Sequence, residues 1–271
     1  MVITPESFNT LQAQMKRLYW LLVLLFLAGS AYAGWKYRDP LLHFYRDHIA
    51  FTSSTEEKES PNPERYQELL ADLSAKQKTL SSRYTRARTA REFSSVISES
   101  RRTLEDTLPE MMRCWLGTPW DFNGTCQTPG SGKIACGYFV STILRDAGFE
   151  VERFRLAQQP SQNIIATFLP REEMHIRAGQ PYADFLDQSI DRGPGLRIVG
   201  LDNHVAFLVI PTSGEPRFIH SSGGAPKCVV DEDRENAHAL MNSNYRVIGN
   251  LTRNDEVIHR WLTGQKWPTK L

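Results

Sequence analysis

The sequence predicts an α+β fold, because three segments with helical periodicity precede a segment with the pattern of a β-hairpin. Two of the helical segments lie between residues 66 and 108, and the third begins near Cys136, after a glycine-rich loop. The hairpin pattern runs from Asp202 to Ser222. With 271 residues, the chain is long enough for one sizeable domain and an appendage.

The composition is that of an ordinary folded protein and argues against two kinds of partner. The formal net charge is +1 and no run of like charge stands out, so we expect no nucleic acid partner. The cysteines are too few for a disulfide scaffold, and none forms a CxxC pair, so we expect no zinc site. The four cysteines are Cys114, Cys126, Cys136 and Cys228.

The N-terminal region combines a polar segment, residues 1–17, with a hydrophobic one, residues 18–35, that has no charged side chain. As a signal peptide, segment 18–35 would be cleaved after Ala31-Tyr32-Ala33, a small-x-small site. As a transmembrane helix it is just long enough and carries aromatic residues near both ends. A core helix of a soluble protein is a third reading. The first two predict a domain in the cell envelope or periplasm if the N-terminus stays inside, with membrane contact through this segment.

Residues 36–108 are polar and prone to form helices, which predicts a helical stalk or hairpin leading into a domain at 109–271. Two amphipathic patterns support this reading. The first comprises Tyr66, Leu69, Leu70, Leu73 and Leu80, and the second comprises Phe93, Val96, Ile97, Leu104 and Leu108.

The helix that begins near Cys136 has one apolar face, and Gly148 suits the position just after its end. The face comprises Phe139, Val140, Ile143, Leu144 and Ala147. Cys136 lies on the same face, at the first turn, where unpaired backbone N–H groups and the helix dipole favour a thiolate and can receive an oxyanion. The sequence therefore indicates a nucleophile, and a buried structural thiol is the alternative.

Two histidines provide candidates for the base that such a nucleophile needs. His204 opens the first hairpin strand and His220 lies near the end of the second, so antiparallel pairing brings them together. A turn limited to Pro211–Pro216 would place the two side chains on opposite faces of the sheet. We therefore predict a bulge or a different loop length that returns them to a common face.

Four stretches, "LGTPW", "CGYFVSTILRDAGF", "NHVAFLV" and "FIHSS", resemble in this order the NlpC-type peptidoglycan peptidases, a branch of the papain-like cysteine peptidases. The resemblance covers about residues 113–251. It implies a cysteine-bearing helix packed on an antiparallel sheet, with Cys136 as nucleophile, His204 as general base and His220 as the polar third member. It also implies hydrolysis of amide bonds in cell-wall stem peptides, commonly beside a D-amino acid, without a metal or other cofactor.

The chain also departs from the family pattern. The family usually has an acidic residue before its cysteine and Ser-Gly after it, where this chain has Ala135, Gly137 and Tyr138. Trp120 stands where the family usually has tyrosine. We expect Trp120, Asp121 and Tyr138 to contact the substrate.

The segment 154–197 is longer than the family core requires, and we expect it to shape the cleft. His175, which lies inside this segment, is expected at the surface rather than among the catalytic groups.

Three classes of function follow. The first is a cysteine peptidase or amidase that acts on peptidoglycan or another peptide. The second is acyl transfer by the same cysteine and histidine, and the third is a catalytically degenerate binding module on an envelope anchor. If the domain is exported, Cys114 and Cys126 could form a disulfide, and two packed thiols are the alternative.

Overall fold

The computed structural model describes residues 60–271. The hydrophobic segment 18–35 and the first part of the expected stalk lie outside these residues. Among the helices of the described part, none combines the length and the apolar character needed to cross a membrane.

A six-stranded antiparallel sheet forms the centre of the fold, in the strand order β1-β6-β2-β3-β4-β5. The strands are β1 (His175–Ala178), β2 (Gly195–Leu201), β3 (Val205–Ile210), β4 (Arg217–Ser221), β5 (Val229–Glu232) and β6 (Tyr245–Asn250). The expected hairpin corresponds to β3 and β4. Together with the helices described below, this sheet confirms the α+β prediction.

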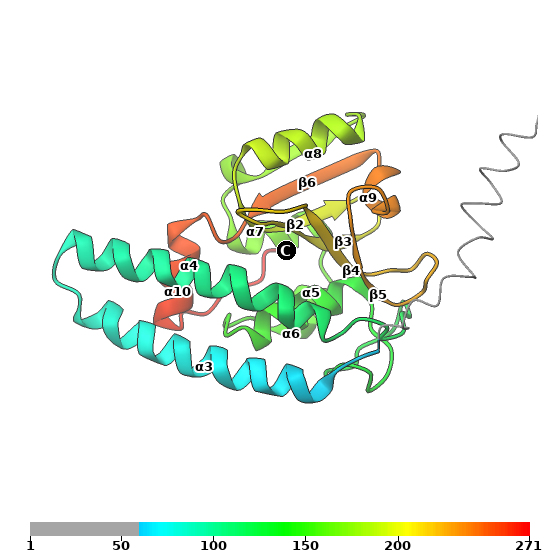
Figure 1. Cartoon of the computed structure of the whole chain (residues 1–271). Helices are drawn as coiled ribbons and strands as arrows, with labels where there is room; N and C mark the ends of the chain where they lie inside the picture. Colours follow the sequence, from blue (N-terminus) through cyan, green and yellow to red (C-terminus); the bar gives the residue numbers. More distant parts are fainter. Residues whose placement is uncertain (1–59) are drawn as a thin grey trace, which may run out of the picture. The chain divides into compact units, whose positions relative to one another are not determined.

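Both faces of the sheet are covered, as Figure 1 shows. On one face, Phe207 and its neighbours pack in the main core with α5 (Cys136–Asp146), α7 (Ser161–Phe168) and α10 (Asp255–Thr263). On the other face, Leu208 and its neighbours pack against α8 (Tyr182–Asp191) and α9 (His238–Met241). Alternate residues of β3 point to opposite faces, so burial of both faces explains why this strand is an unbroken apolar run.

Helices α3 (Pro63–Arg86) and α4 (Ala90–Arg113) form an antiparallel hairpin that belongs to the main core. The Asn62 side chain caps α3, and Thr89 and Glu92 form a capping box at the start of α4. Most of the predicted apolar positions of both helices face inward, whereas Phe93 is exposed. Helix α10 packs against the pair.

The expected boundary between stalk and domain, at residues 108 and 109, falls inside α4. Pro109 does not end this helix, and the next turn buries Met111 and Met112 completely. Burial of these apolar side chains offsets the free-energy cost of the backbone hydrogen bond that proline cannot make. The described part of the expected stalk is therefore packed with the domain as one compact unit.

The segment 154–197 builds structure on both faces of the sheet. It contains most of α6 (Arg153–Ala157), all of α7, the short 3-10 helix η2 (Arg171–Glu173), strand β1, helix α8 and the first residues of β2. Of these elements, the end of α6 and the start of α7 line the cleft described below. The remainder covers or extends the sheet.

Candidate active site

Cys136 is the first residue of α5, and the preceding loop is held on three sides. The Ile134 N–H donates to the carbonyl of Pro119, and the Ile134 carbonyl accepts from the Ser221 hydroxyl at 2.7 Å. The Ala135 N–H donates to the carbonyl of Gly124. Ala135 has an extended backbone, and no side chain caps the start of the helix by a hydrogen bond.

Gly137 allows another chain segment to approach the start of α5. A Cβ atom at this position would overlap the carbonyl oxygen of Ala157, at the end of α6. The close contact accounts for glycine where the resembled family usually has serine. It also fixes the distance between Cys136 and the wall that α6 contributes to the cleft.

Cys136 is half-buried, and partial loss of hydration raises the pKa of its thiol above the ordinary value. Backbone N–H groups of Val205, Gly137 and Cys136 itself act in the opposite direction but are outweighed. The N–H donors at the helix start therefore favour the thiolate, as expected, but the loss of hydration outweighs them. The thiol therefore needs a neighbouring base. The backbone N–H of Val205 contacts the sulfur, and Val205 directly follows His204, so this imidazole lies near the thiol.

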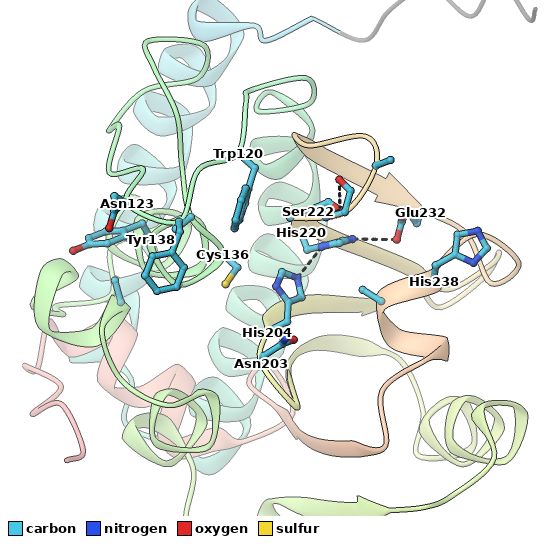
Figure 2. Close-up of a pocket in the computed structure, with 18 of the residues that line it drawn as sticks. Trp120, Asn123, Cys136, Tyr138, Asn203, His204, His220, Ser222, Glu232 and His238 are labelled. Carbon is cyan, nitrogen blue, oxygen red and sulfur yellow. Dashed lines mark hydrogen bonds and ion pairs between the residues drawn. The ribbon is translucent and has the colours of Figure 1, made fainter. Parts of the chain in front are cut away.

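His204 and His220 lie on a common face of the sheet, in agreement with the register prediction. In the β3–β4 ladder Val209 pairs with Arg217 and Phe207 with Ile219, so the ladder is shifted by one residue from the pairing that a turn limited to 211–216 would give. Nε2 of His204 and Nδ1 of His220 are 2.8 Å apart, within hydrogen-bond distance. Figure 2 shows His204 between Cys136 and His220.

Both imidazoles resist protonation. Burial and the neighbouring His220 lower the pKa of His204 to about 3. Burial lowers the pKa of His220 to about 3 as well. At neutral pH His204 is uncharged, which is the state that can accept a proton from a thiol.

Glu232 extends the chain of polar groups beyond the two histidines. Its Oε2 lies 3.0 Å from Nε2 of His220 (Figure 2). Burial raises the pKa of Glu232 to about 7, and Asp233 and Asp231 act in the same direction, whereas His238 and Arg217 oppose it. Sequence reasoning missed this residue, because β5 is short and its acidic end resembles a turn. It joins the site through the pairing of His220 with Val230, two residues before Glu232 on the same strand, which no local sequence pattern indicates.

Cys136 lies where two hollows meet. The larger has a volume of about 1030 Å³, and the smaller one of about 600 Å³. Trp120, Phe122 and Tyr138 give the larger hollow an aromatic wall. The smaller is lined mainly by uncharged polar residues, among them Gln158, Gln159, Ser161, Gln162, Asn203 and Tyr245. A chain bound on both sides of the sulfur would therefore meet two different chemical surroundings.

Two of the three expected substrate-binding residues line the larger hollow. Trp120 is held there by the hydrogen bond from its backbone N–H to the carbonyl of Lys227. The Tyr138 hydroxyl accepts a hydrogen bond from Gln158 at 3.1 Å. Asp121 does not line either hollow: its carboxylate accepts from the Asn123 N–H and pairs with Lys133.

Other sequence-based expectations concern residues outside the cleft. His175 is half-buried in β1 and contacts Arg192, away from Cys136. No disulfide joins Cys114 and Cys126. Within residues 60–271, no group of three or more His, Cys, Asp or Glu side chains could hold a metal ion.

Comparison with known proteins gave no match to a protein-family model, a curated protein or a solved structure. The geometry alone defines what the site can do. A half-buried thiol, a neutral imidazole beside it and N–H groups at a helix start without a side-chain cap are the parts required for nucleophilic attack on a carbonyl carbon.

Proposed function

We propose that the protein is a cysteine hydrolase that cleaves amide bonds in peptides. One observation carries the proposal: the Cys136 thiol opens a helix at the bottom of a cleft, beside a neutral His204 that is hydrogen-bonded to His220. A structural thiol requires neither the cleft nor the paired imidazoles.

In this mechanism His204 removes the thiol proton as the sulfur attacks the carbonyl carbon. The developing oxyanion is stabilised by N–H groups at the start of α5, which no side chain caps. His204 then gives the proton to the departing amine, and a thioester to Cys136 remains. Water activated by His204 hydrolyses the thioester and restores the free thiol.

The substrate that we propose is a stem peptide of bacterial peptidoglycan, in the cell envelope. This part rests on the resemblance of the sequence motifs and on the hydrophobic segment 18–35, which in two of its readings exports the domain. The two hollows support an extended substrate, because a peptide must occupy both sides of the nucleophile to place an internal amide bond at the sulfur.

The test is incubation of the protein with purified peptidoglycan, followed by mass spectrometry of the released peptides. We expect cleavage by the wild type and a loss of at least about 1000-fold in Cys136→Ala, because no nucleophile remains. The matched control is Cys126→Ala, which removes a half-buried thiol from the neighbouring loop and should retain activity.

Three outcomes are informative. Products that carry a new acyl acceptor instead of water would indicate acyl transfer. Equal peptide release by the wild type and Cys136→Ala would refute the role of the nucleophile. Tight binding of peptidoglycan by both proteins without cleavage would indicate a binding module.

A further inference from the structure

The hydrogen bonds behind Cys136 form one continuous chain from His204 through His220 to Glu232. Each link uses a specific ring nitrogen: Nε2 of His204 meets Nδ1 of His220 at 2.8 Å, and Nε2 of His220 meets Oε2 of Glu232 at 3.0 Å. The ring nitrogen of His204 that remains for Cys136 is therefore Nδ1. His220 is about 1% exposed, so water does not offer its ring another partner.

The protonation state of Glu232 decides which nitrogens of this chain carry hydrogen. An ionised carboxylate can only accept, so Nε2 of His220 must then donate to it. Nδ1 of a neutral His220 is left as an acceptor, and it receives the Nε2–H of His204. Nδ1 of His204 is consequently unprotonated, which is the form that can take the proton of Cys136.

A protonated Glu232 permits the opposite arrangement. Its hydroxyl group can donate to Nε2 of His220, which places the hydrogen of that ring on Nδ1. His220 then donates to Nε2 of His204, and the hydrogen of His204 lies on Nδ1, facing Cys136. Each neutral ring keeps one hydrogen, and the added proton resides on Glu232. In this arrangement His204 has no free nitrogen for the thiol.

We propose that Glu232 is a positioning residue that sets the tautomer of His204 through His220, so that ionisation of Glu232 switches on the base for Cys136. The inference deepens the proposed function and rests on it for its catalytic meaning. The tautomer control itself depends only on the three side chains and can be measured without a substrate.

The surroundings of Glu232 place this switch near neutral pH. Glu232 is half-buried, and burial raises its pKa to about 7. Asp231 and Asp233, its neighbours in sequence, raise it further, while Arg217 on β4 and His238 on α9 lower it. The two imidazoles stay uncharged throughout this range because burial lowers the pKa of each to about 3. Of the three groups in this hydrogen-bond chain, Glu232 is therefore the one that ionises between pH 6 and pH 8.

The experiment is nitrogen NMR of the intact protein labelled with 15N-histidine, titrated from pH 5 to pH 9. The variants His204→Asn and His220→Asn assign the signals. Above pH 8 we expect both rings to be Nε2–H tautomers, and below pH 6 we expect loss of that state with a midpoint near pH 7. Rings that keep one tautomer over the whole range would overturn the proposal.

The variant Glu232→Gln tests whether the carboxylate is responsible. Its amide does not titrate, so the tautomers should stop changing with pH. Glu232→Asp keeps the charge and should restore part of the pH dependence. The control is Glu235→Gln, an exposed carboxylate nearby, which should behave as the wild type. A wild-type titration curve in Glu232→Gln would also overturn the proposal.

Alkylation of Cys136 by iodoacetamide, measured by peptide mass spectrometry, gives a second readout. The ratio of the wild-type rate to the Glu232→Gln rate cancels the titration of the thiol itself. For a pKa of about 7 this ratio should fall about tenfold from pH 8 to pH 6. A ratio independent of pH would contradict the switch. If the tautomers titrate as expected but peptidoglycan is not cleaved, the proposed function fails and the control by Glu232 stands.

Discussion

At the scale of single residues, the reactivity of Cys136 depends on what surrounds the sulfur. Burial holds its pKa above the ordinary value, and the helix start does not reverse the effect. The thiol therefore relies on His204, and small displacements of the start of α5 should matter because proton transfer and attack both require close contact.

Gly137→Ala tests this dependence on position. The added methyl group would overlap the Ala157 carbonyl oxygen, so α5 and α6 must separate and Cys136 must move relative to His204. We expect a fall in kcat/KM of about 100-fold, since misplacement by about 1 Å can have that effect. Peptide hydrolysis and the Cys136 alkylation rate measure it.

The control for this substitution is Gly132→Ala. Gly132 lies in the loop before α5, and a Cβ atom there meets only ordinary van der Waals contact with Cys126. Activity of Gly132→Ala should remain near that of the wild type. Full activity in Gly137→Ala would show that the contact with α6 does not position the nucleophile.

At the scale of elements, the α3–α4 hairpin acts as a wall of the core. Tyr66 of α3 is fully buried, its hydroxyl donates to Asp146 at the end of α5 at 2.8 Å, and its ring packs edge-on against Trp115. These contacts connect the hairpin directly to the helix that carries Cys136. Removal of the hairpin would expose the core beneath it.

Leu73→Ala measures how much the hairpin contributes to stability. Leu73 is about 2% exposed in the main core, and its truncation should lower the free energy of unfolding by about 2–5 kcal/mol. Lys76→Ala, on the exposed side of the same helix, should change it by less than about 0.5 kcal/mol. Denaturant unfolding followed by far-UV circular dichroism provides the comparison.

If α3 and α4 formed a separate stalk, the unfolding experiment on Leu73→Ala would give a different result. Unfolding would then proceed in two steps, and only the first would shift. One cooperative transition that moves as a whole is expected instead, because α3, α4, α5 and α10 share one core. For the same reason we expect a fragment that starts at residue 60 to fold and one that starts at residue 113 to aggregate.

At the scale of the whole molecule, the buried polar chain should make the folded state sensitive to acid. Burial lowers the pKa values of His204 and His220 to about 3, so between about pH 4 and pH 6 the unfolded chain binds more protons at these sites. Stability therefore falls as the pH falls through this range. The raised pKa of Glu232, about 7, has the opposite sign between about pH 4.5 and pH 7.

On unfolding in this pH range, the two histidines together gain about two protons and Glu232 loses about one. These three groups therefore bind about one proton more in the unfolded state than in the folded state. We expect the free energy of unfolding to decrease by about 1 kcal/mol per pH unit between pH 6 and pH 5. His220→Asn removes one histidine and should make this slope nearly flat. Chemical denaturation at fixed pH values measures both slopes, and an equally steep slope in His220→Asn would disprove the assignment.

Sequence patterns located α3, α4, α5 and the β3–β4 hairpin, because each pattern reflects an interaction between near neighbours in the chain. The spacing of Leu69 and Leu73 specifies an apolar helix face, and an apolar run between two turns specifies a strand. The same reasoning located Cys136 at a helix start and predicted that the hairpin brings His204, immediately before β3, close to His220 on β4. The shift of the hairpin register could be predicted from the requirement that both histidines share a face.

The remaining features depend on contacts between residues far apart in the sequence, which local patterns do not encode. The raised pKa of Cys136 results from desolvation by surrounding elements, and α3 and α4 pack on the core through contacts with α5 and α10, which are distant in sequence from α3. Glu232 becomes part of the site only because β5 pairs with β4 and brings its carboxylate to His220. The sequence by itself determined three helices, one hairpin and the candidate nucleophile and base. The tertiary structure decided the remaining strands and helices, the proton affinities of the site and the residue that completes the hydrogen-bond chain, because desolvation and hydrogen-bond geometry arise only when distant segments pack together.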